Sequence, residues 1–218
     1  NIHAHYDLAD ALFSLFLDPS MMYSAAVFPH AEATLEEASR HKLDLICRKL
    51  ELQPDDHLLE IGTGWGGLAI HAARHYGCRV TTTTISENQF SYAQRRVLEA
   101  GLADRITVLS QDYRDLQGHY DKLVSVEMIE AVGHGFMDQY FRSCSERLKP
   151  AGRMLLQSIT IADRYHEQAM HAVDFIQKYI FPGGALPSIS AISSAVARVT
   201  DLQISHLHDI GIDYARTL

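Results

Sequence analysis

Residues 59–67 read LEIGTGWGG, and this stretch decides the fold. A short apolar run, residues 57–61, leads into the glycines, and a segment with helical periodicity, residues 66–76, follows them. Gly62 and Gly64 permit backbone angles that other residues resist, and they let a ligand approach the main chain closely. A strand, a glycine loop and a helix in this order are typical of α/β proteins that bind a nucleotide outside the carboxyl ends of their strands.

The alternation of strand and helix continues along the chain. Further strands are predicted from β-branched or apolar runs at residues 78–84, 106–109, 122–126 and 153–161. Helices of 11 to 15 residues are predicted between most of them, at residues 86–100 and 138–148. This rhythm predicts βαβ units with right-handed crossovers, and therefore an α/β fold whose Rossmann-like parallel sheet has helices on both faces.

The remaining segments are expected to surround that sheet within one domain. Thr34 and Glu37 form a capping-box pattern that opens an amphipathic helix. Residues 203–208 alternate like one more strand, and a final antiparallel strand is expected beyond Leu218, so we interpret the chain as a segment of a longer protein. The predicted parts are N-terminal helices that cover the nucleotide site, the core sheet, a helical lid insertion, and a late strand with its loop (residues 1–50, 55–161, 162–199 and 200–218).

Composition excludes several classes of function. The 19 basic and 27 acidic residues give a net charge of −8, which argues against a nucleic-acid partner, because phosphate binding needs a basic face. No apolar run reaches the roughly 18 residues needed to cross a bilayer. The three cysteines, Cys47, Cys78 and Cys144, form no C-x-x-C pair and suit a reducing compartment, so a cytoplasmic location is expected. The 13 histidines have no carboxylate or Cys at ligand spacing, and we predict no metal site.

The residues around the loop distinguish between two nucleotide ligands. Gly67 completes the dinucleotide spacing G-x-G-x-x-G, but the second strand lacks the terminal acidic residue that would hold the ribose of NAD. That strand ends in hydroxyl side chains, which can hydrogen-bond a ribose together with Gln89. Glu60, directly before the loop, is typical of enzymes that use S-adenosylmethionine (SAM). We therefore predict SAM, with contacts from Glu60, Gly62, Gly64, Gly66, Thr84, Ile85, Ser86 and Gln89, and an adenine pocket of Asp112 and Tyr113.

Seven segments in order match one family. They are residues 5–8, 22–24, 60–67, 84–89, 126–134, 179–184 and 213–218. Over essentially all 218 residues the chain resembles the cyclopropane-fatty-acyl-phospholipid synthases and the mycolic-acid cyclopropane synthases and methyltransferases. The context of the second segment adds Tyr23 and Ser24 to the expected SAM contacts. The resemblance implies the SAM-methyltransferase version of the fold.

The resemblance also implies a chemistry. In this family SAM gives its methyl group to the double bond of an acyl chain, which leaves a carbocation, and loss of a proton then closes a cyclopropane ring. A bound bicarbonate is thought to take that proton. A Cys that follows the Tyr-Ser pair, a Glu, a His at the end of the fifth strand and a Tyr near the C-terminal end hold the bicarbonate.

This chain has only part of that set, which makes it a divergent member. Glu130 and Tyr214 match, but Ala25 stands at the Cys position and Gln157 at the His position. Ala has no side-chain donor and Gln carries no positive charge, so bicarbonate binding is doubtful. A buried Glu130 with a raised pKa can itself act as the base, with Tyr214 assisting and Gln157 replacing the His.

We therefore predict methyl transfer to the double bond of an unsaturated fatty-acyl chain of a phospholipid, at the inner membrane surface. The product is a cyclopropane or a methyl-branched chain. Two alternatives stay open: a small-molecule methyltransferase with another acceptor, and a SAM- or lipid-binding relative with impaired catalysis. The apolar stripe Phe175, Ile176, Tyr179, Ile180 and Phe181 is either the wall of an acyl tunnel or ordinary packing. The oligomeric state, including a homodimer, is left open.

Overall fold

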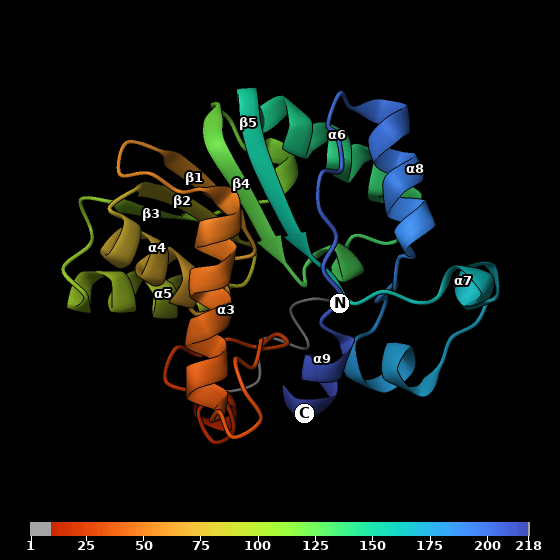
Figure 1. Cartoon of the computed structure of the whole chain (residues 1–218), viewed down its shortest axis with the longest axis horizontal. Coiled ribbons are helices and arrows are strands. Elements are labelled where there is room, and N and C mark those ends of the chain that lie inside the picture. The colour runs from red at the N-terminus through yellow and green to blue at the C-terminus, as the bar shows by residue number, and fades with distance from the viewer. Residues whose placement is uncertain (1–9, 218) are drawn as a thin grey trace.

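A single parallel sheet forms the centre of the computed structural model, which describes residues 10–217 (Figure 1). Its strands lie in the order β3-β2-β1-β4-β5, and all four pairings are parallel. Their bounds are β1 His57–Ile61, β2 Arg79–Thr84, β3 Ile106–Ser110, β4 Tyr120–Val126 and β5 Leu148–Gln157. The predicted parallel α/β sheet is thus confirmed. The strand order reverses at β1, and such a switch point leaves a crevice at the carboxyl ends of the strands.

Helices cover both faces of the sheet (Figure 1). On one face lie α3 (Leu35–Leu50), α4 (Gly67–Tyr76) and α5 (Glu87–Glu99), and on the other α6 (Met137–Arg147) and α8 (Ile189–Val199). Because successive side chains of a strand point to opposite faces, β1 serves both cores. Leu58 packs in the cluster under α3 and α4, whereas Leu59 and Ile61 pack in the cluster under α6.

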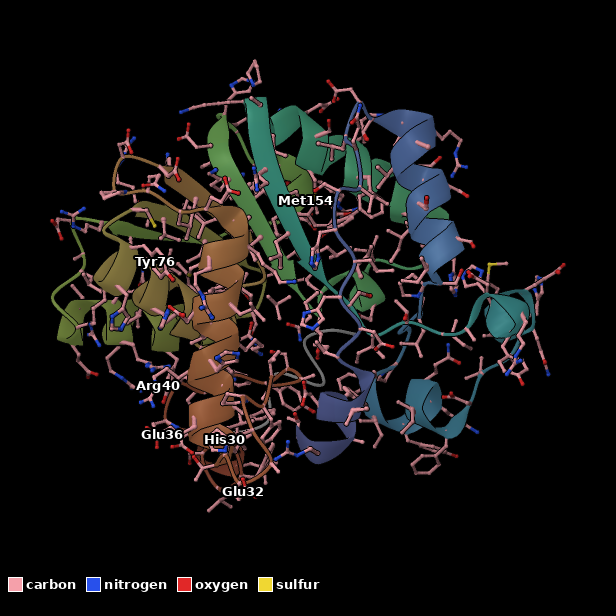
Figure 2. All side chains as sticks on the ribbon, in the orientation of Figure 1. His30, Glu32, Glu36, Arg40, Tyr76 and Met154 are labelled. Atoms are coloured by element: carbon pink, nitrogen blue, oxygen red, sulfur yellow. The ribbon has the colours of Figure 1, made fainter. Side chains whose placement is uncertain are left out.

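Helix α3 begins as its sequence predicts. The Thr34 hydroxyl accepts from the Glu37 backbone N–H, and the Glu37 carboxylate accepts from the Thr34 N–H, which is a complete capping box. Tyr76, at the end of α4, lies beside α3, and its hydroxyl donates to Asp44 at 2.7 Å (Figure 2). The capping box fixes the start of α3, and the Tyr76 hydrogen bond joins α3 to α4.

The N-terminal segment covers the glycine loop. Helix α2 (Asp10–Phe13) brings the Phe13 ring to 4.6 Å from the ring of Trp65, which belongs to the loop itself. Phe13, Met21 and Trp65 form a small buried cluster of their own. This segment therefore packs on the glycine loop, and its role as the cover of a nucleotide site stays a prediction. Residues 1–9, which include the matching segment 5–8, lie outside the described residues.

The lid is shorter than predicted. Residues 162–187 do stand apart from the sheet and contain α7 (Asp163–Met170) and a five-residue π-helix, η4 (Ile176–Ile180). Helix α8, however, packs on α6 and buries Ala195 and Val196 in the second core cluster. Residues 188–199 therefore belong to the core. The amphipathic pattern of α8 could not by itself tell a lid helix from a core helix.

The predicted strand at residues 203–208 is wrong. This segment joins no strand of the sheet, and Ile204 and Leu207 are exposed. The Lys49 ammonium lies within 3.4 Å of the His206 and His208 rings, so the segment contacts the end of α3. The chain then forms α9 (Gly211–Thr217), where a loop was expected.

Three short 3₁₀-helices complete the carboxyl side of the sheet. They are η1 (Tyr113–Asp115) after β3, and η2 (Ile129–Ala131) and η3 (His134–Phe136) after β4. Residues at the carboxyl ends of neighbouring parallel strands share one edge, so η1 and η2 lie on the same side as the glycine loop. Among residues 10–217, no helix is both long enough and apolar enough to cross a membrane.

Candidate active site

The glycine loop has the backbone that a close-lying ligand requires. Gly62, Gly64 and Gly66 have φ of 101°, 53° and 85°, in the region that favours glycine. The N–H groups of Gly62 and Thr63 both donate to the carbonyl oxygen of Thr83 at 3.0 Å, which ties the loop to β2. A Cβ added to Gly64 would meet nothing within 4 Å, so the loop faces open space there. This cradle fits the SAM prediction.

Glu60 lies beneath that loop and is only 4% exposed. The Thr82 hydroxyl donates to its Oε2 at 2.6 Å and lies 2.7 Å from the Thr63 hydroxyl of the loop. Burial raises the pKa of Glu60 to about 8, against the opposing effect of the Thr82 hydrogen bond. An ammonium group bound nearby would lower that pKa again by attraction. Contact between Glu60 and the methionine amino group stays a prediction.

The polar groups expected to hold the ribose are bonded to one another. The Thr84 hydroxyl donates to Oε1 of Gln89 at 2.8 Å and accepts from the Ser86 N–H at 3.1 Å. All three side chains are buried, and Ile85 is half-buried between them. Ser86 caps α5 by accepting from the Gln89 N–H. These residues shape the end of β2, and their contact with a ribose stays a prediction.

The two residues expected at adenine also have partners. Both carboxylate oxygens of Asp112 accept from the Arg114 guanidinium, at 2.9 and 2.7 Å, and this hydrogen bonding lowers the pKa of Asp112. The Tyr113 ring packs edge-on against Tyr140 at 5.5 Å. Sequence analysis did not foresee Arg114 as the partner of Asp112. An adenine contact by this pair stays a prediction.

Glu130, in η2, has one carboxylate oxygen held by hydrogen bonds and a second that is buried without a partner among the described residues. Its Oε1 accepts from the Ser158 hydroxyl at 2.9 Å and from the Ile159 N–H at 2.6 Å. Its Oε2 is buried and has no hydrogen-bond partner among the described residues. Burial raises the pKa of Glu130 to about 7, although these hydrogen bonds lower it. The glycine loop lies close by, since a Cβ on Gly62 would be 3.3 Å from Met128.

Gln157, at the end of β5, was expected to replace the His of the bicarbonate site, and its side chain holds the carboxylate of Glu127. Its amide Nε2 donates to Oε1 of Glu127 at 2.9 Å and to the carbonyl oxygen of Ala25 at 3.0 Å. The Ala25 N–H donates to the same Glu127 oxygen at 2.9 Å. Glu127 had no predicted role in the site. The available signal was a second acid three residues before Glu130, on the same loop.

Helix α9 brings Tyr214 to this group. The Ala26 N–H donates to the Thr217 hydroxyl at 3.0 Å, which joins α9 to the segment after Tyr23. Burial raises the pKa of Tyr214, and the charges of Glu127 and Glu130 raise it further. Burial likewise raises the pKa of Tyr23, with Tyr214 and Glu127 adding to the effect. The structure thus groups the predicted Tyr23, Glu130, Gln157 and Tyr214 around the unforeseen Glu127.

A buried lysine, Lys42, lies next to the residues around Glu127. Lys42 of α3 is 1% exposed, and its ammonium donates to the Ser24 hydroxyl at 2.6 Å. Burial lowers the pKa of Lys42 to about 8, while the charges of Glu127 and Asp18 act in the opposite direction. Ser24 is therefore anchored to Lys42, and its contact with SAM stays a prediction. No sequence pattern predicted that Lys42 or Ser158 would lie in the site.

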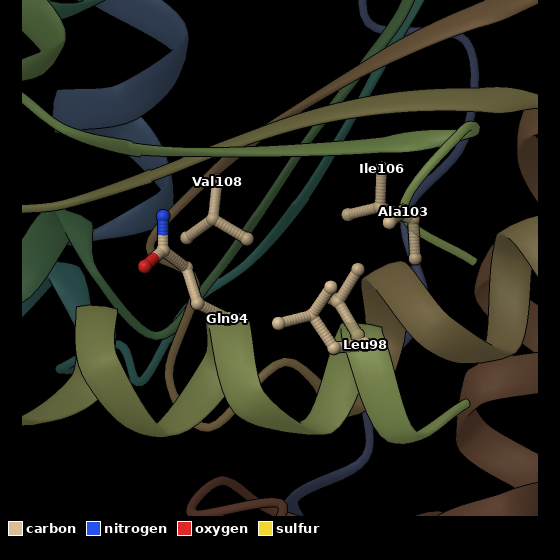
Figure 3. Close-up of a pocket in the computed structure, with 6 residues that line it drawn as sticks. Gln94, Leu98, Ala103, Ile106 and Val108 are labelled. Atoms are coloured by element: carbon tan, nitrogen blue, oxygen red, sulfur yellow. The ribbon is translucent and has the colours of Figure 1, made fainter. Parts of the chain in front are cut away.

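A hollow elsewhere on the molecule does not belong to this site. It lies between α5 and β3 and is lined by Gln94 and apolar side chains, among them Leu98, Ala103, Ile106 and Val108 (Figure 3). Ile106 is the first residue of β3, so the hollow lies toward the amino ends of the strands. The glycine loop and the acids lie at the opposite, carboxyl ends.

Known proteins are similar to this chain in sequence. Tuberculostearic acid methyltransferase UfaA1 of Mycobacterium tuberculosis is 41% identical over 225 residues, which cover 100% of this chain and 52% of that protein. The cyclopropane-fatty-acyl-phospholipid synthase of Escherichia coli K12 is 43% identical over 214 residues, which cover 98% of this chain and 53% of that protein. The chain therefore spans about half the length of these two relatives.

A solved structure agrees with the fold. Mycolic acid cyclopropane synthase CmaA1, in its complex with SAH and CTAB, superposes with a TM-score of 0.91 at 34% identity, covering 99% of this chain and 79% of that chain. The family profile described as mycolic acid cyclopropane synthetase matches residues 1–218. With a match over its whole length, the chain belongs to the mycolic acid cyclopropane synthetase family.

Proposed function

We propose that this chain catalyses SAM-dependent methyl transfer to the double bond of an unsaturated fatty-acyl chain of a phospholipid, giving a cyclopropane or methyl-branched acyl chain. The observation that carries the proposal is the Glu130 carboxyl, buried beside the glycine loop, with Oε1 held and Oε2 unpartnered among the described residues. An acceptor for a proton from hydrocarbon needs such a dry, fixed oxygen with a pKa near neutrality. Family membership supports the same chemistry.

When bound, SAM supplies a methyl group that bonds to one alkene carbon through the alkene's electron pair, while the sulfur keeps the pair of the broken S–CH₃ bond. The neighbouring acyl carbon is then a cation. Glu130 accepts a proton from the new methyl group, and the C–H electron pair closes the ring. After a hydride shift, loss of a proton from the methyl group leaves a methylene branch. Loss of a proton from a neighbouring chain carbon instead leaves a methyl branch beside a C=C bond, and neither route needs a reductant. Ser158 and Ile159 hold Glu130 in place through hydrogen bonds to its Oε1.

The names of relatives support a fatty-acyl acceptor. A protein 38% identical over 220 residues is a probable fatty acid methyltransferase of Pseudomonas putida. The CmaA1 structure that superposes on this chain contains CTAB. Both observations support an acceptor with a long alkyl chain, and the vesicle assay below tests phospholipid as that acceptor.

The lid offers a surface for lipid, at the cytoplasmic face of the membrane. Val173, Phe175 and Tyr179 are 74%, 66% and 60% exposed, so the apolar stripe is not packed in the core. Contiguous exposed apolar side chains mark contact sites for membranes or other apolar partners. We propose that the lid contacts the bilayer peripherally while the acyl chain reaches Glu130.

The test is incubation of the protein with methyl-labelled SAM and vesicles of unsaturated phospholipid, followed by mass analysis of the acyl chains. A gain of one labelled CH₂ on the acyl chain supports the proposal. Transfer only to added small-molecule acceptors would favour the alternative methyltransferase. Intact SAM binding with no transfer to any acceptor would favour a binding protein.

A further inference from the structure

A second acid occupies the place where the family holds an anion. The four positions assigned to bicarbonate are Ala25, Glu130, Gln157 and Tyr214. Two of them, Ala25 and Gln157, donate N–H groups to the same oxygen of Glu127, each at 2.9 Å. The other two, Glu130 and Tyr214, both have pKa values that the charge of Glu127 helps to raise. The Glu127 carboxylate therefore lies among all four.

Bicarbonate does not fit this arrangement. The side chain at Ala25 has no donor, and the Gln157 amide already donates to Glu127 and to the Ala25 carbonyl. A second anion would lie next to the Glu127 carboxylate in a partly buried, low-dielectric site, where like charges repel strongly. The Ala25 N–H and the Gln157 amide, the donors at the two replaced positions, are engaged by the Glu127 carboxylate.

The backbone at Glu127 is unusual for a residue with a side chain. Its φ is +47°, a region that L residues rarely adopt and that glycine adopts freely. The Glu127 N–H donates to the carbonyl oxygen of Gln157 at 2.8 Å, so Gln157 holds both its backbone and its carboxylate. Strained backbone of this kind is retained where the surrounding structure fixes a group for function.

The surroundings of Glu127 include a positive charge. The Lys42 ammonium lies under Ser24 and is attracted by Glu127, because the charge of Glu127 raises the lysine's pKa against the effect of burial. Tyr23, Tyr214 and Glu130 complete the titratable groups that sense its charge.

We propose that the Glu127 carboxylate is a built-in anion that replaces bicarbonate, so that this protein turns over without it. Glu127 provides a fixed negative charge facing the acyl cation, and Glu130 takes the proton. A preorganised charge of this kind stabilises the developing cation without any reorganisation. The inference rests on the proposed acyl methyl transfer.

The first experiment measures acyl-chain methylation in CO₂-free buffer, with and without millimolar bicarbonate. We expect the wild-type rate to be the same in both. If bicarbonate raises the wild-type rate by more than about tenfold, equivalent to about 1.4 kcal/mol, the proposal is overturned.

The second experiment compares Glu127→Gln with Glu99→Gln, an exposed surface acid on α5. The amide introduced by Glu127→Gln keeps the shape and one acceptor but loses the charge, so kcat should fall about 100-fold with SAH affinity unchanged. The acidic limb of its residual pH profile should move to lower pH, because the charge that raises the pKa of Glu130 is gone. The Glu99 variant should match the wild type. A Glu127→Gln enzyme with the wild-type rate and pH profile would remove the charge from the mechanism.

The third variant, Glu127→Gly, suits the positive φ and vacates the anion position while leaving its donors in place. Millimolar formate or bicarbonate should restore part of its turnover. If neither formate nor bicarbonate restores any turnover, the Glu127 carboxylate does not occupy an anion-binding site. These failures are distinct from failure of the proposed function, in which the wild type methylates no acyl chain under any of these conditions.

Discussion

Glu130 shows how one side chain's surroundings set its chemistry. An ordinary glutamate is ionised far below neutral pH and is a weak base, but burial raises the pKa of Glu130 to about 7. The hydrogen bonds from Ser158 and Ile159 lower it, and they also leave Oε2 as the reactive oxygen. A base must be deprotonated to act, so the fraction of competent enzyme should fall as pH drops below about 7.

Replacing Glu130 by Gln should therefore abolish turnover, with a loss of kcat on the order of 10³-fold, because a general base typically contributes that much. SAM affinity should hardly change, since the hydrogen bonds of Glu130 go to Ser158 and Ile159 and not to the glycine loop. The measurement is acyl-chain methylation from about pH 6 to 8, on either side of the Glu130 pKa, beside calorimetric binding of SAH. Wild-type kcat should rise through about pH 7, and unchanged activity in the Glu130→Gln enzyme would exclude Glu130 from the reaction.

At the level of elements, the start of α4 positions the N-terminal segment that lies on the glycine loop. A Cβ on Gly67 would lie 2.6 Å from the carbonyl oxygen of Ser20 and 3.0 Å from the sulfur of Met22. The Arg96 guanidinium donates to the carbonyl oxygens of Ser20 and Trp65, at 2.9 and 3.0 Å. Helices α4 and α5 thus hold the segment that leads to Tyr23 directly on the glycine loop.

The variant Gly67→Ala should displace that segment, because the backbone oxygen of Ser20 has to move. Overpacking of this kind costs about 1–3 kcal/mol of unfolding free energy. We expect denaturant unfolding to show that loss and the KM for SAM to rise. Gly135→Ala is the matched control, since a Cβ there meets nothing within 4 Å. Equal stability and KM in the two variants would show that the Ser20 contact does not shape the SAM site.

Across the whole molecule, apolar side chains are divided between two buried clusters and an exposed group in the lid. The two core clusters lie on the two faces of the sheet, whereas the exposed aromatic rings of Phe175 and Tyr179 lie in the lid, 5.0 Å apart. Figure 1 shows α7 and the lid on the side of the molecule away from α4 and α5. Burying one such ring in an apolar phase contributes about 1.5–3 kcal/mol, so the pair can dock the protein to a bilayer.

Replacing both rings by Ser should weaken binding to vesicles by at least about tenfold, in line with that area term. The rate on a dispersed short-chain unsaturated substrate should stay near wild type, because the acids are untouched. Cosedimentation with phospholipid vesicles measures the binding. Leu98→Ser, an exposed apolar residue on α5, serves as control. Unchanged vesicle binding in the double variant would assign the lid another role.

The sequence by itself predicted the parallel sheet, the glycine loop and the capped start of α3, because the strand–helix alternation, the glycine spacing and the capping residues are patterns within short stretches of chain. It misplaced residues 203–208, since an alternating pattern does not reveal whether a strand finds a partner. Only the tertiary structure decided the partner of Gln157. Glu127 lies 102 residues from Ala25 and 30 from Gln157, and their meeting at one oxygen depends on how the sheet, η2 and the N-terminal segment pack.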